Sequence, residues 1–222
     1  MKSLKSLITV LILGLLSSVS LVSCLDDDNS NQQLTEEQKQ KCVASMSGSY
    51  NGNLYFLNKE IDLTKYKNQT DSVENVKVRF HYPASTIDMY DIPAKLFFKQ
   101  LKNHDDLKAA AEDYGTVDLK LNYTPFNIAS NGVISYYMEP QTVSMSLNYG
   151  GEVHNIKVAF MLNTTGAWLN KRVELIFVEY AIYDGTDSAG KDVLLDGKAL
   201  YSTSLSDTDL DDLMFKYQGE SK

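Results

Sequence analysis

Few residues of this chain are arranged in a way that could support chemistry. Its three histidines, His81, His104 and His154, lie far apart, and none has a partner at the spacing typical of a metal site. The sequence contains no glycine-rich phosphate loop and no Gly-x-Ser-x-Gly segment for a nucleophilic serine. It therefore predicts no catalytic residue, no cofactor and no metal ligand.

Cys24 is the residue with the clearest expected chemistry. Lys2 and Lys5 precede ten apolar residues (7–16), enough for a signal peptide and too few for a membrane-spanning helix. Residues 21–24 (Leu-Val-Ser-Cys) then resemble the bacterial lipobox. The resemblance implies that residues 1–23 are removed and that Cys24 carries lipid, with acyl chains such as palmitate. The alternative is an ordinary secretory signal with a chance cysteine.

Three acidic residues follow the lipobox closely. Asp26, Asp27 and Asp28 resemble the short acidic export tag of surface lipoproteins of Bacteroidota. The resemblance implies an outer-membrane protein that faces the cell exterior, and a periplasm-facing protein is the alternative. The same charges also suit a solvated tether, and residues 24–34 are polar and without period. Ten such residues span about 17 Å on average, so the folded body is expected close to the membrane.

Charge and cysteine content narrow the possible partners. The signal peptide removes two lysines and no acid, so 19 basic residues (21 − 2) face 29 acidic ones, a net charge of −10. With no basic cluster, nucleic-acid binding is not expected. If Cys24 is lipidated, Cys42 has no partner for a disulfide and is predicted to be a small buried residue. Residues 35–222 suit one globular domain, and the oligomeric state stays open.

Local patterns predict a mostly β body. Thr35 and Gln38 form a capping box that opens a helix ending at Gly48. Two short helices are predicted after Pro93 and from Asp105 to Tyr114. Strands are expected elsewhere: 50–56, 76–82, 117–123, 133–138, the 142–160 hairpin, 172–183, 193–195, 198–203 and 213–217. A capping signal at Ser206 and Asp209 leaves a final helix open as the alternative to the last strand. Residues 58–74 and 184–192 are predicted loops.

These elements predict a mainly β fold, at the margin of α+β. The expected architecture is an antiparallel two-sheet sandwich or flattened barrel with an N-terminal helix and a short two-helix insertion. The helix leading into Gly48-Ser49-Tyr50 is similar to the opening of small Bacteroidota lipoproteins, some of them lipocalin-like. In the hairpin, a turn at Gly150-Gly151 places Leu147 opposite His154 and Met145 opposite Ile156.

Two serines are candidates for modification. Asp71-Ser72-Val73 and Asp187-Ser188-Ala189 resemble the acceptor triplet of Bacteroidota O-glycosylation, and both serines are predicted to lie in loops. Among the aromatic residues, Tyr55, Tyr90, Tyr136 and Trp168 are candidates for glycan stacking or, alternatively, ordinary strand residues.

Three functions remain open. The first is a non-enzymatic, lipid-anchored surface protein that binds a glycan or a protein partner or builds the envelope. The second is a lipocalin-like carrier, which would need a deep cavity for a small apolar ligand. The third is an enzyme without a recognised motif, which would need titratable side chains within hydrogen-bond reach in a cleft.

Overall fold

The computed structural model describes residues 33–58, 69–200 and 213–221. Its first helix, α2 (Glu36–Met46), begins at the predicted capping box. The Gln38 amide N–H donates to Thr35 Oγ1 at 3.2 Å, and the Thr35 N–H donates to Gln38 Oε1 at 2.8 Å. Cys42, Val43 and Met46 are buried on one side of the helix, so the predicted apolar stripe packs against the rest of the body.

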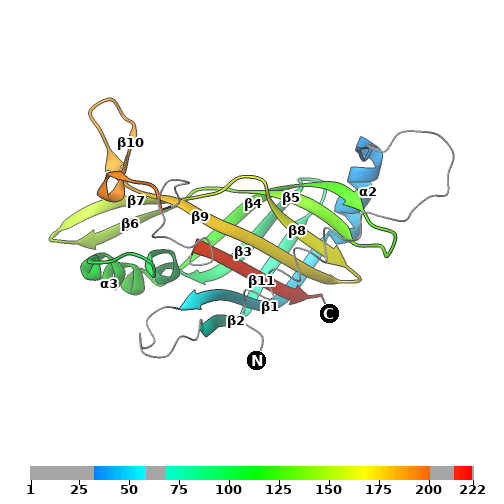
Figure 1. Ribbon diagram of the computed structural model, residues 1–222, viewed down its shortest axis with the longest axis horizontal. Coiled ribbons are helices and arrows are strands. Elements are labelled where there is room, and N and C mark those ends of the chain that lie inside the picture. Colours follow the sequence, from blue (N-terminus) through cyan, green and yellow to red (C-terminus); the bar gives the residue numbers. More distant parts are fainter. Residues whose placement is uncertain (1–32, 59–68, 201–212, 222) are drawn as a thin grey trace.

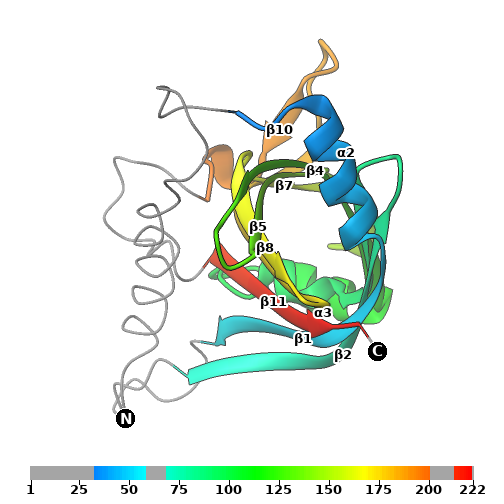
Figure 2. The ribbon, with the colours of Figure 1, turned by 90° about the vertical axis from the view of Figure 1, so that its right-hand side faces the viewer.

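Eight antiparallel strands of the described chain close into a barrel, seen along its axis in Figure 2. β11 pairs with both β9 and β1 and so leaves the barrel without an open edge. Of the two predicted architectures, the barrel is the one that forms. In order around it the strands are β1 (Gly48–Asn58), β2 (Gln69–His81), β3 (Thr86–Pro93), β4 (Thr116–Ile128), β5 (Ile134–Pro140), β8 (Thr164–Leu169), β9 (Arg172–Thr186) and β11 (Met214–Glu220).

The wall of the barrel follows from period-two alternation in the sequence. In β4 the residues at 117, 119, 121 and 123 are buried, whereas Asp118, Lys120 and Asn122 are exposed between them. Successive side chains of a strand point to opposite faces, so one set fills the interior and the other meets water. The strand predicted at 117–123 is confirmed, and it is buried on one face only.

A second set of strands extends the sheet beyond the barrel (Figure 1). The later part of β9 pairs with β7 (Glu152–Phe160) and β10 (Asp192–Leu194), and β6 (Val143–Tyr149) pairs with β7. The turn between β6 and β7 uses Gly150 and Gly151 at φ values of 59° and 87°, which only glycine adopts easily. The predicted register is confirmed, with Leu147 opposite His154 and Met145 opposite Ile156.

Helical segments lie at both ends of the barrel. Helix α2 lies along the rim of one end in Figure 2, and we call this the α2 end. At the other, the distal end, lie the short 3₁₀ helix η1 (Ala94–Phe98) and helix α3 (Asp105–Tyr114), as Figure 1 shows. A further 3₁₀ turn, η2 (Leu195–Gly197), follows β10. The predicted helix after Pro93 is therefore a single 3₁₀ segment, while α3 has its predicted bounds.

Aromatic side chains meet inside the barrel at two levels. Near α2, Phe80 of β2 packs edge-on against Tyr136 of β5 with ring centroids 5.9 Å apart, and Tyr50 and Tyr123 each lie 5.3 Å from Phe80. Phe80 and Tyr136 come from separate parts of the wall, so their contact fills the interior at this level. At the distal end the rings that meet are Phe97, Phe160, Phe177 and Phe215.

Several predicted elements need correction. β3 and β8 were not expected: acidic residues interrupt the apolar pattern of β3, and Gly166 interrupts that of β8. At Gly166 any Cβ would overlap the Tyr136 ring, so this inward position carries no apolar side chain. The predicted loop 58–74 is partly strand, because β2 begins at Gln69.

The C-terminal part of the chain also differs from expectation. β9 continues to Thr186 instead of ending before the predicted loop 184–192. Residues 198–200 are not strand, and the rest of the predicted strand 198–203 lies outside the described residues, as does the helix signalled at Ser206. The last predicted strand is confirmed as β11, which closes the barrel.

Candidate functional site

The residues predicted from the sequence as sites are not brought together. Cys24 and the acidic run Asp26, Asp27 and Asp28 lie outside the described residues. Ser188 lies in an exposed turn, as predicted. Ser72 instead lies within β2, half-buried and opposite Tyr55 of β1, so its predicted loop location is wrong. β2 starts earlier than its apolar alternation indicates, because the mostly polar residues 69–73 also pair with β1.

A groove of about 500 Å³ is hollowed into the outer surface at the distal end of the barrel. Four elements meet there: the end of β3, the end of α3, the first residues of β4 and the first residues of β6. Its lining is mostly polar and includes carboxylates, hydroxyls, an amide, an ammonium group and one phenol. The lining residues are Asp91, Tyr114, Thr116, Val117, Asp118, Lys120, Gln141, Thr142, Val143 and Ser144.

A β-bulge places the backbone of Asp91 beside the carboxylate of Asp118. Between the pairs Met89–Leu119 and Ile92–Val117, β3 has one residue more than β4, and Asp91 takes a positive φ of 57°. The Asp91 amide N–H donates to Asp118 Oδ1 at 3.1 Å. The bulge thereby holds Asp118 in place with a backbone donor.

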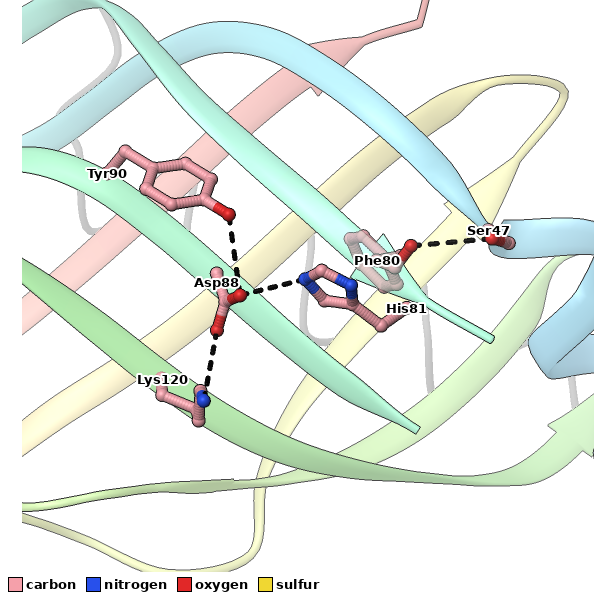
Figure 3. A network of polar contacts seen from close by, with 6 residues as sticks. All are labelled: Ser47, Phe80, His81, Asp88, Tyr90 and Lys120. Carbon is pink, nitrogen blue, oxygen red and sulfur yellow. Dashed lines mark hydrogen bonds and ion pairs between the residues drawn. The ribbon is translucent and has the colours of Figure 1, made fainter. Parts of the chain in front are cut away.

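Next to the groove, Asp88 of β3 is the centre of a polar network (Figure 3). Its Oδ2 lies 2.8 Å from His81 Nε2 and accepts a longer hydrogen bond from the Tyr90 hydroxyl at 3.4 Å. Its Oδ1 lies 3.9 Å from the Lys120 ammonium. The pKa of Tyr90 is raised, first by desolvation and then by the charge and hydrogen bond of Asp88. Lys120 thus joins this network to the groove.

The groove and this network offer hydrogen-bond partners of both kinds. Asp91 and Asp118 accept hydrogen bonds, Lys120 donates them, and the hydroxyl and amide groups do both. Tyr114 adds an aromatic face with 44% of its surface exposed. Such a set can hold a neutral, hydroxyl-rich molecule, because each hydroxyl needs a donor and an acceptor nearby.

A second polar cluster lies on the sheet extension. Asp184 Oδ2 accepts a hydrogen bond from the Tyr149 hydroxyl at 2.7 Å and lies 3.0 Å from His154 Nδ1. The Tyr149 and His154 rings stack with centroids 3.8 Å apart. Desolvation and Asp184 raise the pKa of Tyr149. These contacts fasten the hairpin to β9, and His154 lies at the turn end of the apolar face as the register predicts.

The described residues contain no group of three or more histidine, cysteine, aspartate or glutamate side chains placed to hold a metal ion. Of the four aromatic candidates, Tyr136 is fully buried and Trp168 donates its indole N–H to the Tyr50 hydroxyl at 2.9 Å. Tyr55 is half-buried on β1, and Tyr90 belongs to the Asp88 network. These four residues therefore do not form one stacking platform.

The groove was not predicted from the sequence. Asp118 and Lys120 were visible only as the polar half of an alternating strand, and Asp91 fell in no predicted element. The one available signal was the acidic interruption of β3 at Asp88 and Asp91, where the apolar pattern alone would have continued.

Comparison with known proteins identifies the family to which this chain belongs. In the part of the chain that the structure describes, no helix has the length and apolar character needed to span a membrane. No curated protein and no solved structure gives a significant match. A family model matches residues 45–183, from the end of α2 into β9, which includes all groove residues. The match covers more than half of the sequence, and the chain belongs to the family DUF4840, a domain of unknown function.

Proposed function

We propose that this protein is a lipid-anchored cell-envelope protein that binds a glycan in the distal groove. The observation that carries the proposal is the composition of the groove, in which two carboxylates, an ammonium, an amide and several hydroxyls surround about 500 Å³. A sugar presents hydroxyls that both donate and accept, together with an apolar C–H face that can lie on Tyr114.

Other ligand classes suit the groove less well. The two carboxylates in the groove lining disfavour a phosphate backbone, which needs a cationic footprint. A small apolar ligand would leave these polar groups desolvated without partners, which costs free energy. We retain the lipocalin-like carrier only as an alternative. A closed eight-stranded barrel supports it, but the ring contacts inside the barrel weigh against it.

Glycan binding is tested with the mature chain on an array of bacterial and host glycans, followed by titration of the strongest binder. Asp118→Asn should weaken binding strongly, because it replaces an acceptor of charge-assisted hydrogen bonds with a weaker amide. Asp113→Asn is the matched control, since Asp113 is exposed on α3 beside Tyr114 and does not line the groove. Equal affinities of the two variants would place the site elsewhere.

The anchor is tested through Cys24. Cys24→Ala should leave the body folded while abolishing incorporation of a labelled fatty acid. If the variant still incorporates the label, the lipobox reading is wrong.

Outward display is tested separately. Replacement of Asp26, Asp27 and Asp28 by alanine should keep the protein in the outer membrane but shield it from protease added to intact cells. Equal digestion of the native and variant proteins would leave the three aspartates as a spacer only.

The exposed turn of Ser188 makes it the better of the two glycosylation candidates. Ser188→Ala should remove a glycan mass that Ser72→Ala leaves in place. Intact mass spectrometry of the protein from its native membrane measures both variants.

A further inference from the structure

The N-terminal part of the described chain joins the folded body at the α2 end of the barrel. Leu34 packs against the core, and α2 begins two residues later and lies along the rim of this end. If Cys24 carries lipid, which is part of the proposed function, nine mostly polar residues lie between it and Leu34, and this stretch spans about 17 Å on average. The tether therefore brings the α2 end, and not the distal end, to the lipid surface.

The distal end lies much farther from the start of α2 than the α2 end does. β4 runs the length of the wall with 13 residues, from the groove at Thr116 to the α2 end at Ile128. At a rise of about 3.4 Å per residue the strand is about 40 Å long, more than twice the average span of the tether.

We propose that the α2 end docks onto the membrane surface, with its turns at 82–85, 129–133 and 170–171 against the lipid headgroups. Strand pairing brings these turns to one end: Phe80 pairs with Gly48, Ile128 with Ile134, and Trp168 with both Ile134 and Val173. The groove then stands away from the membrane, where an external glycan can reach it.

The side chains at this end suit a headgroup layer. Tyr82 and Ile128 are 55% and 45% exposed, and Phe126 stacks on Tyr137 of the outer wall at a centroid distance of 4.2 Å. Lys171 is exposed in the turn before β9. Amphipathic aromatic rings and lysines with long apolar stems are favoured at this level of a bilayer, since each has an apolar body and a polar tip.

The single tryptophan of the chain gives a direct test of this orientation. Trp168 lies at the α2 end, so its emission should fall when the lipidated protein is placed on phosphatidylcholine vesicles whose headgroups carry a nitroxide quencher. A Trp168→Phe, Val153→Trp variant moves the only tryptophan to the tip of the β6–β7 hairpin, where Val153 is 68% exposed. Its emission should stay nearly unchanged on the same vesicles.

Amide hydrogen exchange provides a second measurement that needs no tryptophan substitution. On vesicles, turns 82–85 and 129–133 should exchange more slowly than in the Cys24→Ala protein in solution, and the Gly150-Gly151 turn should not change. Tyr82→Ser together with Ile128→Ser should reduce both the quenching of Trp168 and this protection. Val153→Ser is the matched control and should reduce neither.

Failure of the proposed docking and failure of the proposed lipid anchor give different results. If the native protein stays on the vesicles and both tryptophan positions are quenched equally, or neither is, docking through the α2 end is refuted and the anchor stands. If the native protein does not associate with the vesicles and carries no lipid, the anchor itself is refuted.

Discussion

The two ends of the barrel are closed by different chemistry. At the α2 end the rings of three tyrosines surround Phe80, and the Tyr50 hydroxyl donates to Met46 O at 2.6 Å and accepts the indole N–H of Trp168. At the distal end the rings are phenyl groups, and η1 is held by packing of Phe97 against Phe160 and Phe215. Hydrogen bonds thus fix the position of one cap, while burial of apolar surface holds the other.

The distal end also contains a buried carboxyl group, whereas the α2 end has none among the described residues. Glu179 of β9 is fully buried, and its Oε2 accepts a hydrogen bond from Gln100 Nε2 at 2.6 Å. Its Oε1 and Gln100 Oε1 have no partner. Burial raises the pKa of Glu179 strongly, and Lys99 and Gln100 oppose this only in part. The apolar core at this end therefore also contains the Glu179 carboxyl group, one oxygen of which has no hydrogen-bond partner.

The largest effect is expected from the packed cap. Phe97→Ala should lower the free energy of unfolding by about 3–5 kcal/mol, because it removes a buried ring and leaves a cavity at the distal end. Urea denaturation measures the change. A loss below about 1 kcal/mol would show that η1 does not depend on this contact.

The buried acid predicts a pH dependence. Because the folded-state pKa of Glu179 is raised above the value of about 4.3 in an unfolded chain, its contribution to stability is full below that pH and is lost as the pH rises toward the folded-state pKa. Glu179→Gln cannot ionise, so its melting temperature should exceed that of the native protein increasingly as the pH rises above about 4.

Thermal melts across the pH range compare this variant with Glu112→Gln, whose carboxylate is exposed in an ion pair with Lys95. The Glu112 variant should follow the native curve. Parallel curves for the native protein and Glu179→Gln would contradict the assignment of a raised pKa.

Smaller and opposite effects are expected at the α2 end. Tyr50→Phe removes a hydroxyl bonded to Met46 O and the Trp168 indole, so it should cost about 1–3 kcal/mol for one buried and one partly buried hydrogen bond. Tyr123→Phe removes a buried hydroxyl without a partner and should be neutral or stabilising. Urea denaturation measures the free energy of unfolding of both variants. An equal decrease in the two would mean that hydrogen bonding does not distinguish these tyrosines.

Local signals explain which parts of the fold the sequence predicted. The Thr35 capping box, the i, i+3, i+4, i+7 pattern of α3 and the Gly150-Gly151 turn each lie within one short segment, and all three are confirmed. Barrel closure depends on pairing of β11 with β1 and β9, strands far apart in the sequence, so the patterns left a sandwich equally open.

The groove could not be predicted for a related reason. Asp91 and Asp118 meet because one extra residue in β3 shifts its register against β4, and this shift has no signature in a single sequence. Lys120 comes from β4 and Gln141 from the segment before β6, which the fold brings together through the Gln141 N–H to Lys120 O hydrogen bond. Each residue alone reads as an ordinary surface position.

We propose that the ligand binds on the outer wall at the distal end and not inside the barrel. Calorimetric titration of the glycan selected on the array, with the native protein, Asp118→Asn and the interior variant Met138→Leu, tests it most directly. We predict that Asp118→Asn loses about tenfold or more in affinity, equivalent to about 1.4 kcal/mol, while Met138→Leu binds as the native protein does. Weakened binding by Met138→Leu with full affinity in Asp118→Asn would contradict binding in the groove and place the ligand inside the barrel.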